Sequence, residues 1–142
     1  MILTRSAASK GQEMTRHRAA AVAQVNQMIG DTRLIFITDI PGQGAIYAEK
    51  EAEAISYMAL DPAPADLAPY PFIEQEMLAT GMTGHECAQL FLNMAAQWRP
   101  LGAQLEGLRI GCNHKISAAL SKQEVDLVLA DLEAALRAYA QG

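Results

Sequence analysis

The chain has 142 residues, a formal net charge of −5 and an aromatic content of only 6%. One domain is the default for this length, and the negative balance argues against nucleic acid as a partner. We expect no membrane span, because no apolar run approaches the ~18–20 residues that a spanning helix needs. The first ten residues lack the apolar stretch of a secretory signal, so we expect a protein that is not exported and whose two cysteines stay reduced.

The first predicted helix begins at Ser6 and runs to about Gly30. Residues 33–38 are ambiguous, because their β-branched side chains favour a strand while their position favours a continued helix. We expect the helix to continue to about Thr38, since a lone strand without a pairing partner is unstable. The apolar positions of this helix include Met14, Ala21, Val22, Val25, Met28 and Ile29.

A turn is predicted at Ile40-Pro-Gly-Gln-Gly44, followed by a second helix from about Ala45 to Leu60. A turn before a helix can also bind an anion, but the lysine and serine of a phosphate-binding loop are missing here. We expect the small side chains of this helix to face a neighbouring helix and its charged ones to face solvent. The small face holds Ala48, Ala52, Ile55 and Ala59, and the outer face holds Glu49, Lys50, Glu51 and Glu53.

The stretch from Asp61 to Pro71 contains four of the six prolines. Proline fixes φ and disfavours a helix in the residue before it, so residues 61–71 are predicted to form a stiff, extended connector. A short helix from Phe72 to Ala79, ended by Gly81, is expected to follow.

A long helix is predicted from Thr83 to Leu120, because Thr83-Gly-His-Glu86 has the pattern of a capping box. Ten apolar residues repeat along it at steps of three or four, which form a seam that companion helices must cover. Pro100 lies inside this helix and should bend it near Trp98. The seam consists of Cys87, Leu90, Met94, Trp98, Leu101, Leu105, Leu108, Cys112, Ile116 and Ala119.

A last helix is predicted from Ser121, which begins a second capping box, to about Ala140 and antiparallel to the end of the long one. Its seam is Val125, Val128 or Leu129, Leu132, Ala135 and Tyr139. The predicted fold is therefore all-α, an extended antiparallel helical bundle or hairpin. Its divisions are a helical hairpin at 1–60, the connector at 61–71 and a helical domain at 72–142. The predicted core is Leu90, Met94, Leu101, Leu105, Leu108, Ile116 and Leu132.

The histidines and cysteines do not predict a chemical site. Neighbours such as His85, Glu86 and Cys87 point in different directions on a helix, and zinc-ligand spacing is missing. Cys87 and Cys112 lie ~37 Å apart along the predicted helix, too far for a disulfide, and on an apolar seam a thiol is inert. We expect no catalytic residues, no metal and no cofactor.

The candidate functional residues are therefore surfaces for a protein partner. Trp98 and Arg99 are of the residue types enriched at binding hot spots, although Trp98 is also in phase with the core seam. The basic first helix and the acidic middle can attract each other within or between subunits, with Glu49 and Glu53 as the acidic side. The predicted partner-binding set is Arg16, Arg18, Val22, Val25, Ile29, Trp98 and Arg99.

Several segments resemble small proteins of tailed bacteriophages and prophages that are encoded near tail-fibre genes. They are Ile40-Pro-Gly-Gln-Gly44, Tyr47-Ala-Glu-Lys-Glu-Ala-Glu-Ala54, Tyr70-Pro-Phe-Ile-Glu-Gln-Glu76, Ala79-Thr-Gly-Met-Thr83 and Ala95-Ala-Gln-Trp-Arg99. The resemblance, which spans residues 40–116, implies a tail-fibre assembly protein or chaperone without catalytic residues.

We therefore expect a chain that binds a tail fibre or baseplate protein and helps it to fold or attach. Such a protein would work in the host cytoplasm during assembly, with the virion tail as a further location. The second hypothesis is a self-assembling structural subunit of the tail or baseplate, which makes a homo-oligomer. A DNA-binding helical regulator is less favoured, because the total charge is negative, and an enzyme is rated lowest.

Overall fold

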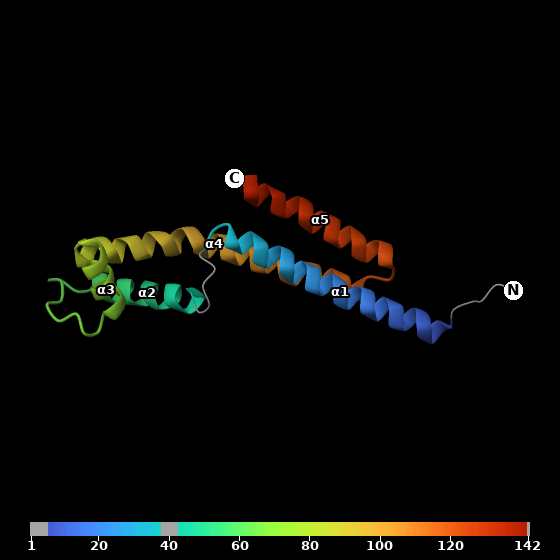
Figure 1. The fold of residues 1–142 in the computed structure, drawn as a ribbon, viewed down its shortest axis with the longest axis horizontal. Helices are drawn as coiled ribbons and strands as arrows, with labels where there is room; N and C mark the ends of the chain where they lie inside the picture. The colour runs from blue at the N-terminus through green and yellow to red at the C-terminus, as the bar shows by residue number, and fades with distance from the viewer. Residues whose placement is uncertain (1–5, 38–42, 142) are drawn as a thin grey trace. The chain divides into compact units, whose positions relative to one another are not determined.

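The computed structural model describes residues 6–37 and 43–141, and these fold into helices without a strand (Figure 1). The predicted all-α fold is confirmed. The described chain divides into two compact units. Unit 1 holds the residues up to 37 and from 102 onward, and unit 2 holds those from 43 to 101. The helices are α1 (Ala7–Leu34), α2 (Gln43–Met58), α3 (Pro71–Thr80), α4 (Gly84–Ala118) and α5 (Lys122–Gln141).

Unit 1 consists of α1, the second half of α4 and α5. Contacts near both ends show that α1 and α4 run antiparallel. Arg33 pairs with Glu106 at one end over 3.3 Å, and an Arg18 Nη donates to the Ala119 carbonyl at the other over 2.7 Å. The predicted packing of companion helices on the second half of the long helix is therefore confirmed.

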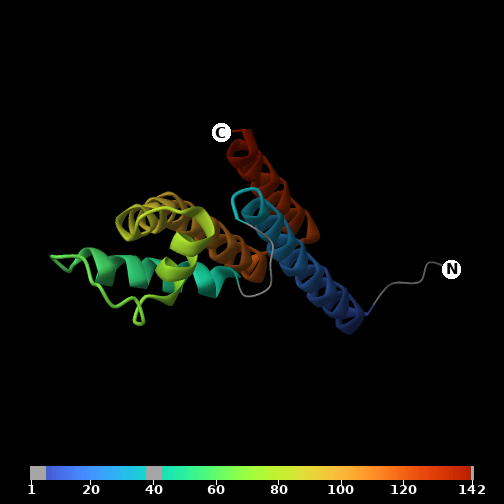
Figure 2. The same cartoon turned by 60° about the vertical axis from the view of Figure 1, so that its left-hand side comes forward.

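The last helix, α5, turns back along α4 and so runs parallel to α1. The Tyr139 hydroxyl donates to Gln104 Oε1 over 2.8 Å, far from the turn that joins α4 to α5. His17 Nε2 lies 2.8 Å from Asp126 Oδ1 and ties α1 to α5. Figures 1 and 2 show α1 and α5 side by side in both views.

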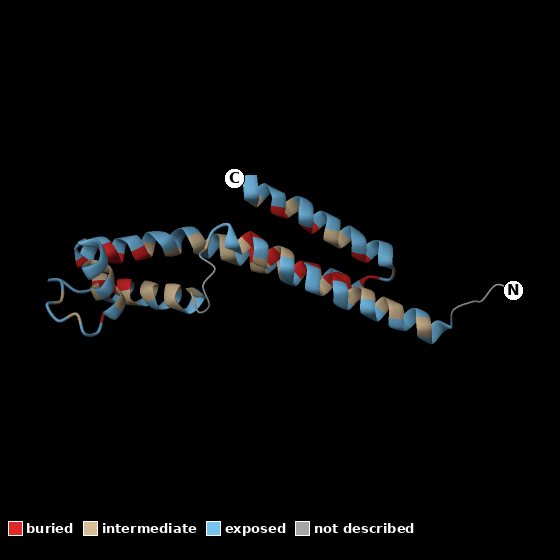
Figure 3. Cartoon of the chain, in the orientation of Figure 1, coloured by how far each residue is buried: buried red, intermediate tan, exposed pale blue. Residues whose placement is uncertain are grey.

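The core of unit 1 collects apolar side chains from all three helices, and Figure 3 shows buried residues on the facing sides of α1 and α5. Removing these side chains from water is the main favourable term in folding. The buried apolar residues of unit 1 are Ala21, Val25, Ile29, Leu105, Cys112, Ile116, Ala119, Val125, Leu132 and Leu136.

Unit 2 consists of α2, α3 and the first half of α4. The rings of Tyr57 and Tyr70 meet edge to face, with centroids 5.4 Å apart and an interplanar angle of 89°. This geometry places the positive ring edge over the negative face of its neighbour. The core of unit 2 is Ala54, Tyr57, Tyr70, Ile73, Cys87, Ala88 and Phe91.

Local capping signals in the sequence set several helix ends. The Thr83 and Ser121 hydroxyls each accept a hydrogen bond from the backbone N–H three residues later, over 3.1 Å, as a capping box predicts. Gly81 ends α3 with a φ of 76°, a left-handed conformation that glycine adopts without steric cost.

The predicted seam of the long helix is wrong at two of its positions in unit 2, although Cys87 is buried as predicted. Leu90 and Met94 are 36% and 38% exposed and are not core residues. In unit 2 the buried face of α4 instead carries Ala88 and Phe91 beside Cys87. The reason is that α2 and α3 cover a face of α4 that includes Cys87 but is rotated away from Leu90 and Met94. Of the other predicted core residues, Leu105, Ile116 and Leu132 are buried, and Leu101 and Leu108 are half-buried.

Both predicted faces of α2 are also wrong. The small-residue face at positions 48, 52, 55 and 59 is exposed, and Ala54 and Tyr57 are buried instead. Of the four charged residues predicted to face solvent, only Glu49 does so, while Lys50, Glu51 and Glu53 are half-buried.

The ends of the first two helices differ slightly from prediction. The helix α1 ends at Leu34 and residues 35–37 form a turn, so the strand alternative for 33–37 is wrong. Thr38 and positions 40–42 of the predicted turn lie outside the described residues, and α2 already begins at Gln43. The two units also divide the chain differently from the predicted segments 1–60, 61–71 and 72–142.

Candidate partner-binding surfaces

The five predicted partner-binding residues on α1 lie in unit 1, and two of them are buried in its core. Val25 and Ile29 are fully buried in the core, so a partner cannot reach them while unit 1 is folded. Val22 is half-buried, and only Arg16 is exposed.

Arg18 has a structural partner within unit 1. Its guanidinium donates to the Ala119 carbonyl over 2.7 Å, just beyond the C-terminus of α4. A cation there compensates the negative end of the helix dipole and satisfies a carbonyl that has no intrahelical donor. The role of Arg18 in this structure is therefore to join α1 to the end of α4.

The other two predicted residues, Trp98 and Arg99, lie on α4 in unit 2. Trp98 is half-buried, whereas the Arg99 side chain is exposed and pairs with Glu51 of α2. These two residues belong to unit 2 and the five on α1 belong to unit 1. Their role in partner binding stays a prediction.

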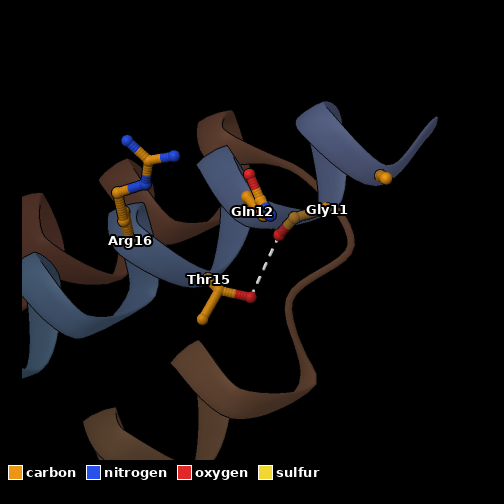
Figure 4. A pocket seen from close by; sticks show the side chains of 5 residues that line it. Gly11, Gln12, Thr15 and Arg16 are labelled. Atoms are coloured by element: carbon orange, nitrogen blue, oxygen red, sulfur yellow. Dashed lines mark hydrogen bonds between the residues drawn. The ribbon is translucent and has the colours of Figure 1, made fainter. Parts of the chain in front are cut away.

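A hollow on unit 1 lies along the first turns of α1 (Figure 4). Ala8, Gly11, Gln12, Thr15 and Arg16 line it, all from one helix. The Thr15 hydroxyl donates to the Gly11 carbonyl over 3.0 Å, and Arg16 points in another direction. Because a ligand pocket needs polar groups that converge from several elements, this hollow provides no chemical site.

The two thiols lie in separate cores. Burial raises the pKa of the Cys87 thiol, and the nearby carboxylates of Glu76 and Glu86 raise it further. Burial is also the main cause of the raised pKa of Cys112. Both thiols therefore stay protonated at neutral pH and are poor nucleophiles. Among residues 6–37 and 43–141, no group of three His, Cys, Asp or Glu side chains could hold a metal ion.

Two charged side chains of α2, Glu53 and Lys50, contact α3 inside unit 2, and the sequence does not predict these contacts. The N-cap position of α3, Tyr70, makes no side-chain capping bond. The carboxylate of Glu53 on α2 does so instead, with Oε1 accepting from the Phe72 N–H over 3.1 Å and Oε2 from the Ile73 N–H over 3.0 Å. A carboxylate also compensates the positive end of the helix dipole. The sequence signal for this contact is that α3 begins without a capping side chain at Tyr70.

Lys50 is a second charged residue of α2 that contacts α3. Its Nζ lies 3.5 Å from Glu76 Oε2 and 4.7 Å from the centroid of the Phe91 ring. A cation over an aromatic face is attracted by the ring quadrupole. Together with Glu53, Lys50 makes the charged face of α2 an internal contact surface of unit 2.

Replacing Glu53 by alanine is expected to lower the free energy of unfolding by about 1–2 kcal/mol, because two backbone N–H groups of α3 lose their acceptor. Chemical denaturation measures this loss. Glu49→Ala is the matched control, since Glu49 is exposed on the same helix and such surface changes stay within about 0.5 kcal/mol. Equal effects of the two substitutions would contradict the capping role.

The largest apolar run on the described surface is the end of α1. Leu34, Ile35 and Phe36 are 44%, 56% and 44% exposed, three consecutive large side chains within unit 1. We call these three residues the α1 end patch. Single exposed apolar residues are ordinary, whereas a run of three such residues is a candidate interaction site.

No helix of the described chain is both long and apolar enough to cross a membrane. Comparison with known proteins found no matching family model, no matching curated protein and no matching solved structure.

Proposed function

We propose that this chain is a non-enzymatic adaptor that binds a tail fibre or baseplate protein of a tailed bacteriophage and assists its folding or attachment. The proposal of a tail-fibre partner rests on the resemblance of residues 40–116 to small phage proteins that are encoded near tail-fibre genes. The binding part rests on the α1 end patch, whose three adjacent apolar side chains lie exposed at a helix end. Buried, protonated thiols in two separate cores favour a binding role over a nucleophilic one.

Co-expression with a tail-fibre protein of a tailed bacteriophage tests this function. We expect the two proteins to co-elute on gel filtration and the yield of soluble fibre to rise when the chain is present. A fibre that folds equally well alone, with no complex formed, would overturn the proposal.

The double substitution Ile35→Ser with Phe36→Ser tests the binding surface. We expect it to weaken the complex at least tenfold while the helical circular dichroism of the chain is kept. Leu120→Ser is the matched control, because Leu120 is a single exposed apolar residue of the same unit. Equal binding by all three proteins would exclude the α1 end patch.

The second candidate is a self-assembling structural subunit, since the same exposed apolar patch can join copies of the chain. Light scattering of the purified chain separates the two. A monomer at micromolar concentration excludes self-assembly, whereas an oligomer that Ile35→Ser and Phe36→Ser dissociate would favour it over the adaptor.

A further inference from the structure

The middle of α4, residues 93–104, adds no buried residue to either core, and Leu92 before it packs against the core of unit 2. The buried residues of its first half end at Phe91, and those of its second half begin at Leu105. From Leu92 to Gln104 every residue is exposed or half-buried. Helices in proteins owe most of their stability to packing of an apolar face, so this middle stretch is the least supported part of α4.

The backbone is weakest at the same place. Pro100 lies inside α4 and has no N–H, so the Ala96 carbonyl lacks its intrahelical donor. Gly102 follows two residues later and is a poor helix former. The division between the two units falls between Leu101 and Gly102.

Hydrogen bonds and ion pairs between side chains hold the residues on either side of this point. Arg99 pairs with Glu51 inside unit 2. On the other side, Gln104 accepts from Tyr139, and Glu106 pairs with Arg33, both inside unit 1. Residues 100–103 between them are Pro, Leu, Gly and Ala, whose side chains have no hydrogen-bonding groups.

We propose that residues 100–103 of α4 are a hinge that opens locally while both units stay folded. Opening there breaks a few backbone hydrogen bonds and exposes one half-buried leucine, Leu101, without disturbing either core. Proteins open locally with free energies far below that of global unfolding, most easily where few apolar contacts are buried. Such opening lets one unit move without unfolding the other. This proposal does not depend on the proposed function.

Hydrogen exchange of the full chain, followed by mass spectrometry, tests the hinge. We expect the amides of residues 101–104 to exchange at least tenfold faster than those near Phe91 and Ile116. Pro100→Ala restores the missing backbone donor and should slow this exchange at least tenfold. Pro69→Ala is the matched control, because Pro69 is exposed in the segment before α3 and should leave exchange in α4 unchanged.

A protease that cleaves after small and aliphatic residues gives a second measurement. We expect the first cut in α4 to fall after Leu101, Gly102 or Ala103 and to slow in the Pro100→Ala variant. Two results would overturn the hinge. One is amide exchange at residues 101–104 that is as slow as in the flanking turns of α4, and the other is a first proteolytic cut elsewhere in α4.

Discussion

Replacing Leu132 by alanine is expected to lower the free energy of unfolding by about 2–5 kcal/mol. Leu132 is 2% exposed and lies in the core of unit 1 with residues of α1 and α4. The substitution removes the transfer free energy of the lost methyl groups and leaves a cavity that the surrounding helices fill only in part. Urea denaturation followed by circular dichroism measures the change.

Leu127→Ala is the control for this substitution, because the same residue type occurs on the same helix at 61% exposure. We expect its effect to stay within about 0.5 kcal/mol. The contrast separates loss of core packing from the change in helix propensity, which is the same at both positions. Similar losses for the two variants would mean that α5 does not pack through Leu132.

Replacing Gly84 by alanine is expected to destabilise the protein by about 1–3 kcal/mol. A Cβ at this position would lie 2.2 Å from the Tyr57 hydroxyl oxygen and 2.8 Å from Cζ of the same ring. Tyr57 is buried and held edge to face against Tyr70, so the ring cannot swing aside without disturbing the core of unit 2. Thermal or chemical unfolding measures the loss.

Gly107→Ala is expected to raise the free energy of unfolding, whereas Gly84→Ala lowers it. Gly107 lies in the same helix, and a Cβ there would meet nothing within 4 Å. Alanine is the better helix former, so a gain of about 0.5–1 kcal/mol is expected. Adding Tyr57→Phe to Gly84→Ala should recover part of the loss, because it removes the closest atom. A Gly84→Ala variant as stable as Gly107→Ala would show that no close contact exists.

Much of the fold could be predicted from the sequence, because helix ends depend on local chemistry. Thr83 and Ser121 make the expected capping bonds, and Gly81 has the expected left-handed conformation. In the second half of α4 the seam was also correct, with Leu105 and Ile116 in the core. In that half of the helix, the spacing of the apolar residues and the packing of the neighbouring helices indicate the same buried face.

In unit 2 the periodicity of apolar residues identified the buried faces only in part. A helix with apolar residues on two faces leaves the choice between them to its neighbours. On α4 the neighbours cover Phe91 and leave Leu90 exposed. On α2 the predicted small-residue face is exposed, because Lys50 and Glu53 have partners on α3 and α4 that lie far away in sequence.

The candidate partner-binding residues were the hardest to predict. Val25 and Ile29 are predicted to bind a partner, but both are fully buried in the core of unit 1. Arg18 was assigned to a charged interface, but it donates to the Ala119 carbonyl. Residue type and position on a helix do not distinguish a partner within the chain from one in another molecule.

Each core encloses a single sulfhydryl, Cys87 in unit 2 and Cys112 in unit 1. An alkylating reagent such as a maleimide can reach either group only when its own core opens. The native chain therefore carries two internal probes, and the rate of labelling at each position reports the opening of one unit separately from the other. Peptide mapping after brief exposure to the reagent reads both rates from one sample, without any added dye or engineered residue.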